Sequence, residues 1–144
     1  MKTGDYTVVM IVDVSSADAF KGIERVADWW TTDFTGQSEK REDVFTVRFG
    51  ETFITVKIIE LIPHKKIGWQ VIDCYKHWLK DKKEWKDTKM SWEISTGNNE
   101  TTIHFTHLGL IPGKECYHVC EKAWNFYLNE SLFKLLTVGK GMPD

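Results

Sequence analysis

Two polar side chains occupy strand-like positions that alternate with apolar residues. His107 shares its alternation with Phe105, and Asp73 shares its own with Trp69. Because side chains two positions apart on a strand point to the same face, both polar groups are expected to point inward. An imidazole titrates near neutral pH, so His107 would suit general acid–base catalysis. No accompanying pattern of nucleophile, base and orienting group is recognisable, and a hydrogen-bonded core network is the other interpretation.

Two hydroxyl groups join them from a predicted C-terminal helix, which is indicated by apolar residues at three- and four-residue spacing. At 100° per residue, Tyr127 and Ser131 lie within about 60° of Trp124, on the face expected to meet a sheet. They could bond to His107 and Asp73, or the four groups could orient a bound molecule. The residues predicted on this face are Tyr117, Cys120, Trp124, Tyr127, Leu128, Ser131 and Leu135.

A third chemical possibility is a metal site at the start of the same helix. Cys116 and Cys120 stand at i and i+4, with His118 between them. The imidazole lies about 160° around the helix from the edge that the sulfurs share, so no metal site or other cofactor is predicted. Three unevenly spaced cysteines are not a disulfide framework, and all are expected to be reduced, with Cys74 a small buried apolar residue.

The aromatic residues indicate what kind of molecule the interior would hold. Core packing explains each one singly, since burying a large side chain contributes about 1.5–3 kcal/mol. Seven Trp in 144 residues exceed what a small core usually needs, and together they predict an apolar small-molecule pocket. The predicted ligand-binding residues are Trp29, Trp30, Trp69, Asp73, Trp92, Phe105, His107, Trp124, Tyr127 and Ser131. No residue is assigned a catalytic role.

The elements that position these residues follow from periodicity and turn signals. A strand is expected over 6–14, and Ser15 or Ser16 can cap a helix that breaks near Gly22 and ends at Trp30. Alternating residues then predict antiparallel hairpins joined by turns of Gly, Asn and Pro. The alternating stretches are 45–49, 52–62, 67–75, 88–96 and 103–107.

The charged segment from Lys76 to Asp87 interrupts this pattern. It contains five Lys and three acidic residues around Trp78 and Trp85. Because a run of charges is usually solvated, a solvated hairpin tip is favoured over a mobile loop.

Composition places the chain among single soluble domains. The sequence is 42% hydrophobic and 28% charged, enough for one core over residues 1–144. The net charge of −2 provides no basic excess for a nucleic-acid backbone. Neither a membrane span nor a secretory leader is recognisable, so a cytoplasmic protein is expected.

A second apolar row runs along the predicted helix. Val119, Phe126 and Phe133 recur every seven residues, about 180° from Trp124, and should point away from the sheet. Such a row often marks a partner surface, here a homodimer contact, although the segment 31–41 could cover it instead.

Several phrases resemble the START-like helix-grip superfamily (SRPBCC), which also contains the birch-pollen-allergen-like proteins and the polyketide cyclases. They are VSSADAFKGI with ADWWT, IIELIPHKKIGWQV, NNETTIHFTHLGL and AWNFYLNESLFKLLTVGKG. The match is closest to the heat-shock-protein-90 ATPase activator-like branch and covers nearly the whole chain. It implies an α+β helix-grip fold, in which a curved antiparallel sheet of six to seven strands wraps around a long C-terminal helix. Two short N-terminal helices and an internal cavity complete the implied fold.

The resemblance implies three functions, among which a fold alone does not decide. The preferred one is binding of a small apolar, aromatic or lipid-like ligand in the cavity, as a carrier or sensor. The alternative is an enzyme of cyclase or hydrolase type acting on an aromatic or polyketide-like substrate there. The second alternative is a cochaperone-like interaction module. It has less support, because the eukaryotic activator makes much of its chaperone contact through a separate N-terminal domain.

Overall fold

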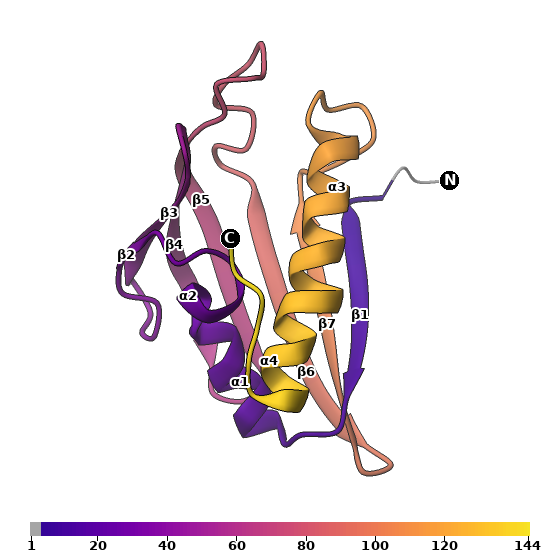
Figure 1. The fold of residues 1–144 in the computed structure, drawn as a ribbon. Helices are drawn as coiled ribbons and strands as arrows, with labels where there is room; N and C mark the ends of the chain where they lie inside the picture. The colour runs from indigo at the N-terminus through magenta and orange to yellow at the C-terminus, as the bar shows by residue number, and fades with distance from the viewer. Residues whose placement is uncertain (1–3) are drawn as a thin grey trace.

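The computed structural model describes residues 4–144 and shows one curved sheet that grips a long C-terminal helix (Figure 1). All strand pairs are antiparallel, in the order β1-β7-β6-β5-β4-β3-β2. The strands are β1 (Tyr6–Val12), β2 (Phe34–Gly36), β3 (Val44–Phe49), β4 (Thr52–Ile62), β5 (Lys66–Tyr75), β6 (Lys89–Gly97) and β7 (Glu100–Leu108). The predicted α+β helix-grip fold is confirmed. Residues 1–3 of the predicted domain lie outside the described range.

Two short helices precede the strands of the hairpins, and one long helix closes the chain. The helical segments are α1 (Ser16–Glu24), α2 (Val26–Trp29), α3 (Tyr117–Phe126), the π-helical η1 (Tyr127–Leu132) and α4 (Phe133–Val138). The Ser15 hydroxyl caps α1 by accepting a hydrogen bond from the backbone N–H of Asp18 at 3.0 Å. The helix breaks at Arg25 rather than near Gly22. Gly22 serves another purpose, because a Cβ there would overlap the Leu136 side chain of α4.

The hairpins predicted from alternation are present. β3 turns into β4 at Gly50 and Glu51, and β6 turns into β7 at Asn98 and Asn99. Both asparagines have positive φ, 52° and 64°, which this residue tolerates in tight turns. These hairpins bring β3 to β7 side by side, so their inward rows form one continuous floor beneath the helix.

A β-bulge changes the orientation predicted for Asp73. The pairing of β4 with β5 shifts register between Thr55 and Val56, where Ile72 is the additional residue on β5. The alternation that places Val71 inward therefore does not continue to Asp73. The Asp73 side chain is 45% exposed and accepts a hydrogen bond from Lys83 Nζ at 2.7 Å. The inward orientation predicted for it is wrong.

The segment that joins β5 to β6, residues 76–88, is also not the solvated tip that its charges predicted. Lys76, Leu79 and Trp85 within it are buried. Successive turns fold it back on itself, and the Leu79 N–H donates to the Lys76 carbonyl at 3.0 Å. Most of its other charged residues are exposed, whereas Leu79 and Trp85 pack in the interior.

The C-terminal helix lies across the sheet with the predicted face inward. Cys120, Trp124, Leu128, Ser131 and Leu135 are buried along it. Tyr117 and Tyr127, at the edges of this face, are half-buried. No helix among residues 4–144 is long and apolar enough to cross a membrane.

The second apolar row of the helix is exposed. Val119, Phe126 and Phe133 are 56%, 40% and 37% exposed. The segment 31–41, the alternative cover for this row, instead contains β2, which pairs with β3 at the far edge of the sheet.

Candidate functional site

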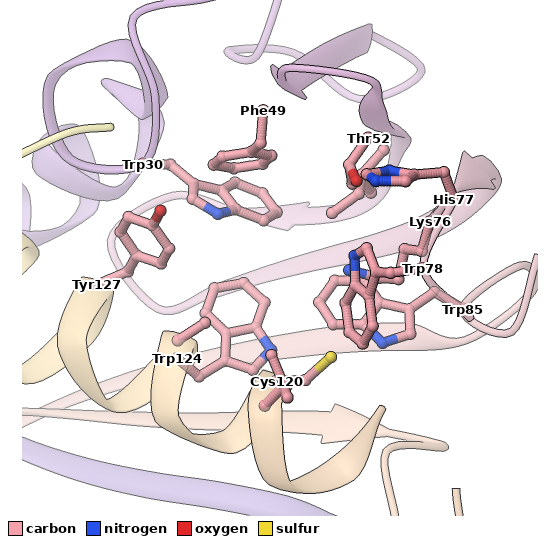
Figure 2. Close-up of a pocket in the computed structure, with 13 residues that line it drawn as sticks. Trp30, Phe49, Thr52, Lys76, His77, Trp78, Trp85, Cys120, Trp124 and Tyr127 are labelled. Atoms are coloured by element: carbon pink, nitrogen blue, oxygen red, sulfur yellow. The ribbon is translucent and has the colours of Figure 1, made fainter. Parts of the chain in front are cut away.

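A cavity of about 310 Å³ lies between α3 and the sheet, where β5 leads into the 76–88 segment (Figure 2). Its walls come from the residue after α2, the β3–β4 hairpin, the 76–88 segment and the helix. The lining residues are Trp30, Phe49, Thr52, Ile54, Lys76, His77, Trp78, Trp85, Val119, Cys120, Ala123, Trp124 and Tyr127. The cavity is therefore bounded by the sheet, the helix and a folded loop.

Aromatic rings form a large part of the cavity wall and contact one another. Trp30 and Trp124 have ring centroids 5.0 Å apart, and Phe49 lies 6.1 Å from Tyr127 on the same side. Trp85 lies parallel to Trp124, with 6.0 Å between centroids and 7° between planes. Because such pairs are stable contacts between side chains, the wall is preformed.

Lys76 places a positive charge in this wall. Its ammonium lies 4.1 Å from the ring centre of Trp85 and 5.7 Å from that of Trp78. The residue is 6% exposed. Burial lowers the pKa of Lys76 to about 8, although the nearby Cys74 and Glu84 act in the opposite direction. At neutral pH the cavity thus holds an ammonium between two indole faces.

Tyr127 contributes a hydroxyl to the opposite side. Burial, together with the carboxylate of Asp144, raises the pKa of Tyr127 to about 12. The hydroxyl therefore stays protonated and can donate a hydrogen bond into the cavity.

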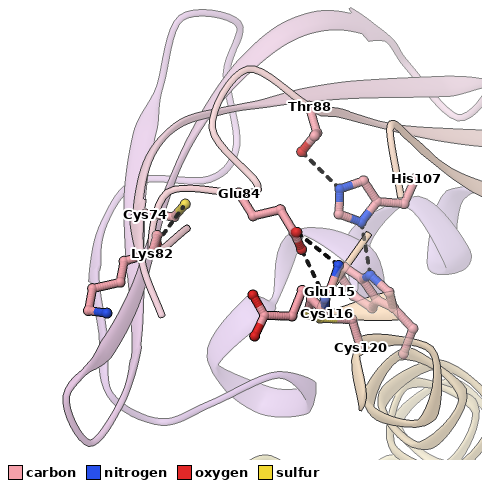
Figure 3. The surroundings of a disulfide bond; sticks show 9 residues. Cys74, Lys82, Glu84, Thr88, His107, Glu115, Cys116 and Cys120 are labelled. Carbon is pink, nitrogen blue, oxygen red and sulfur yellow. Dashed lines mark hydrogen bonds between the residues drawn. A yellow bond between two sulfur atoms is a disulfide. The ribbon is translucent and has the colours of Figure 1, made fainter. Parts of the chain in front are cut away.

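Glu84 anchors the 76–88 segment to the helix beside the cavity (Figure 3). Its carboxylate accepts hydrogen bonds from the backbone N–H groups of Glu115 and Cys116, each at 3.0 Å. These groups precede the first turn of α3, where backbone N–H groups lack helical partners. This contact explains why a loop rich in charge is folded against an apolar wall.

The cysteines differ from the prediction. Cys116 and Cys120 are joined in a disulfide, whereas all three had been expected to be reduced (Figure 3). Their Cα atoms are 5.6 Å apart, because residues at i and i+4 are neighbours on a helix. Cys74 is free and buried, as expected. Within residues 4–144, no group of three or more His, Cys, Asp or Glu side chains could hold a metal ion.

His107 is held in a closed hydrogen-bond network behind the wall. The Trp124 indole N–H donates to its Nδ1 at 3.1 Å, so its proton is on Nε2, 2.9 Å from the Thr88 hydroxyl. That hydroxyl donates to the Trp85 carbonyl at 2.6 Å. Burial lowers the pKa of His107 to about 3, and the charge of Lys76 adds to this effect. Its two ring nitrogens position Trp85 and Trp124 and are not free for proton transfer.

Comparisons with known proteins bear on the fold. No family model and no curated protein matches the chain. Among solved structures, the Aha1 dimer from Colwellia psychrerythraea is 24% identical, with a TM-score of 0.77 over 95% of this chain and 98% of that one. MLL2253 from Mesorhizobium loti is 10% identical, with a TM-score of 0.70 over 91% and 96%. DynU16, from the dynemicin biosynthetic locus, is 16% identical, with a TM-score of 0.69; the match covers 94% of this chain and 48% of DynU16.

The chain has the Aha1-like helix-grip fold. The cavity lies between the curved sheet and the C-terminal helix. Of the ten predicted ligand-binding residues, three line it and seven lie elsewhere. Trp30, Trp124 and Tyr127 line the helix-grip cavity. The seven that lie elsewhere are Trp29, Trp69, Asp73, Trp92, Phe105, His107 and Ser131.

Most of those seven belong to the packed core of the helix grip. Trp29, Trp69, Trp92 and Phe105 are at most 1% exposed. Ser131 donates a hydrogen bond to the Trp29 carbonyl at 2.7 Å and accepts one from the Met142 N–H at 2.7 Å. It ties the helix to α2 and to the C-terminal segment.

The sequence-based prediction did not include ten of the lining residues. Four of them, Lys76, His77, Trp78 and Trp85, lie in the segment that was expected to be solvated. The two Trp residues within this lysine-rich segment could have indicated that it is partly buried, since Trp is uncommon in a freely solvated loop. The others missed are Phe49, Thr52, Ile54, Val119, Cys120 and Ala123.

Proposed function

We propose that this protein binds a small apolar or aromatic molecule in the helix-grip cavity, as a carrier or sensor. The observation that supports this function is a space of about 310 Å³ with mainly apolar walls that are rich in aromatic rings, the usual form of a small-molecule site. The aromatic lining residues are Trp30, Phe49, Trp78, Trp85, Trp124 and Tyr127.

The first experiment compares the purified protein by native and denaturing mass spectrometry. We expect an apolar molecule to be retained under gentle ionisation and to be released on unfolding. A matched pair of variants then tests its location. Ala123→Trp adds an indole to the cavity wall from an exposed helix position, and Lys122→Trp adds the same indole at the adjacent exposed position outside the lining.

The expected result is that Ala123→Trp abolishes retention of the molecule while Lys122→Trp retains it. Both variants change exposed positions of one helix, so their folding should be equally affected and can be compared by thermal unfolding. Retention by both variants would place the ligand elsewhere and contradict the proposal.

The proposal does not include an enzyme that uses His107 as its general acid or base. Both ring nitrogens of His107 are hydrogen-bonded within the core, and its pKa is lowered to about 3. A general base at neutral pH needs an accessible lone pair within reach of the substrate. The cochaperone alternative has only a similarity of fold behind it, since the Aha1 protein is 24% identical.

We further propose that the exposed row of Val119, Phe126 and Phe133 contacts a second copy of the chain. Three large apolar side chains on one helix face support this proposal, and the Aha1 protein of the same fold was solved as a dimer. Val119 also lines the cavity, so a second copy there would approach its rim.

Sedimentation at low micromolar concentration tests the dimer. We expect a species of twice the 16.8 kDa chain mass, which Phe126→Glu converts to a monomer. Gln37→Glu, an added charge at the far edge of the sheet, is the matched control and should remain a dimer. A single 16.8 kDa species for the unmodified protein would contradict the proposal.

A further inference from the structure

Lys76 is a buried cation that forms no ion pair with a carboxylate among residues 4–144. Its residue is 6% exposed and lines the cavity. The ion pairs among residues 4–144 involve other lysines and arginines, none of them Lys76. Charges that are this deeply buried are normally paired, because transfer of an ion from water to an apolar site is costly. A negative charge placed next to the Lys76 ammonium would therefore be stabilising.

Two carboxylates close to Lys76 in the sequence, Glu84 and Asp73, already have other hydrogen-bond partners. Glu84 accepts two backbone hydrogen bonds at the start of α3, each at 3.0 Å. Asp73 accepts hydrogen bonds from Lys83 Nζ at 2.7 Å and from the Cys74 N–H at 2.9 Å. Neither carboxylate can turn to the cavity without breaking these contacts, which favours an anion from outside the chain as the partner of Lys76.

The two indoles attract the ammonium, and among residues 4–144 it makes no hydrogen bond to another side chain or to the backbone. Trp85 and Trp78 present ring faces at 4.1 Å and 5.7 Å, which attract a cation without accepting a conventional hydrogen bond. An ammonium has three N–H donors. Figure 2 shows Lys76 on the same side of the cavity as His77, Trp78 and Trp85.

We propose that the ligand of this cavity is a flat two-ring molecule that carries one anionic group, a carboxylate or a phenolate. The anionic group pairs with the Lys76 ammonium, and the rings lie against Trp30, Trp85 and Trp124. This inference rests on the proposed function, which it makes specific by naming the charge and shape of the ligand. Thr52 and Tyr127 supply hydroxyl groups on the remaining wall.

The cavity size agrees with two rings. An apolar cavity of about 150 Å³ accommodates one benzene molecule. The present cavity of about 310 Å³ is roughly twice as large. A planar ring system would also match walls made of indoles, because offset stacking between aromatic planes is favourable.

The test uses two probes of the same shape, 2-naphthoate and its neutral amide, 2-naphthamide, titrated by calorimetry at a pH of about 6.5, where the Lys76 ammonium is charged. We expect the anion to bind at least about tenfold more tightly than the amide, which corresponds to about 1.4 kcal/mol. In Lys76→Met this preference should disappear, while the affinity for the amide stays within about twofold.

Lys80→Met is the matched control, because Lys80 is an exposed lysine of the same segment and does not line the cavity. It should retain the preference for the anion. Thermal unfolding separates binding from folding: a Lys76→Met protein that melts at or above the temperature of the unmodified protein has lost a binding group, not a structural one.

Three results would overturn the inference. Equal affinity for both probes would remove the anionic group from the proposal and leave the proposed apolar ligand standing. A preference that persists in Lys76→Met would assign the charge recognition to another residue. Failure of both probes to bind the unmodified protein would contradict the two-ring ligand, and an empty cavity by mass spectrometry as well would contradict the proposed function itself.

Discussion

Trp29, Trp69 and Trp92 form an inner triad at the centre of the molecule, with ring centroids 5.3, 5.7 and 6.4 Å apart. At the end of the molecule, Trp85 and Trp124 instead border an open cavity. The triad comes from α2, β5 and β6, and its three rings are at most 1% exposed. The same residue type therefore makes a dry core in one region and a cavity wall in the other.

The difference follows from what carries the rings. In the inner triad every ring is attached to a helix or strand, so sheet spacing and helix packing bring the rings together. Two of the cavity indoles, Trp78 and Trp85, lie in the 76–88 segment, which is held to α3 through Glu84. Because this loop is held at the start of α3 and not by strand pairing, it does not pack tightly against the sheet. The cavity lies between the two.

The largest expected difference between the regions is in stability. Trp69→Ala should lower the free energy of unfolding by about 3–5 kcal/mol, because it opens a large void in a packed core. Trp78→Ala should lower it by less than about 1 kcal/mol, because this side chain is 43% exposed at the cavity rim. Urea unfolding measures both changes. Similar losses for the two variants would show that the cavity wall is ordinary core.

The second difference is in acid stability and depends on His107. Its folded pKa of about 3 is below the unfolded value of about 6.5, so the folded protein binds fewer protons. Stability due to the neutral imidazole is complete above about pH 6.5 and falls by about 1.4 kcal/mol per pH unit toward pH 3.

His107→Gln provides the comparison, because it removes the titration but keeps a polar side chain. The stability difference between the two proteins should shrink as the pH falls from about 6.5 toward 4. Unfolding curves at several pH values test this. A difference that is independent of pH would show that His107 is protonated in the folded protein and that its assigned hydrogen bonds are incorrect.

The third difference concerns two indole N–H groups. The N–H of Trp124 donates to His107, whereas the buried N–H of Trp92 has no partner among the described residues. Trp124→Phe leaves the His107 Nδ1 unpaired, so it should cost about 1–3 kcal/mol more than Trp92→Phe. The two variants remove the same atoms, and chemical denaturation compares them directly. Equal costs would show that the hydrogen bond to His107 contributes little.

The smallest expected effect is a gain. Lys76→Met should raise the free energy of unfolding by about 1–2 kcal/mol at pH 7, because it replaces a buried unpaired charge with an apolar side chain of similar length. Burial places the folded pKa near 8, below the unfolded value of about 10.4. The cost of the charge is therefore complete below pH 8 and declines as the pH rises toward 10.4, so the advantage of the variant should decline as well.

The groups that face Lys76 have to be considered in the same pH series. They are the Cys74 thiol, the Glu84 carboxylate and the His107 imidazole. Burial raises the pKa of Cys74, so this thiol also titrates at alkaline pH. Cys74→Ala in both backgrounds separates the two titrations. A loss of stability in Lys76→Met at pH 7 would show that the cation–π contacts outweigh the cost of burial.

Local periodicity was sufficient for most of the fold. Alternation and turn residues predicted β4 over 52–62 at its observed bounds and the β6–β7 hairpin at Asn98 and Asn99. Helical spacing predicted both the buried face of the C-terminal helix around Trp124 and the exposed row that includes Phe126. These features depend on residues within one element or between chain neighbours, so the sequence pattern contains the needed information.

The cavity depends on contacts between distant parts of the chain. Asp73 turned outward because a bulge inserts one residue into β5, which strand alternation does not encode. Lys76 and Trp85 became part of a buried wall because Glu84 binds the start of α3, some thirty residues further along the chain.

The sequence by itself thus determined the strands other than β2, and the C-terminal helix with its two faces, since these follow from the repeat of side chains along one element. Only the tertiary structure decided which aromatic residues pack and which leave a cavity, and that His107 lies behind the wall while Lys76 lies within it. The physical reason is that a charged or aromatic loop is buried only where another part of the chain binds it. Here the backbone N–H groups at the start of α3, which have no partner within the helix, bind Glu84 of the loop.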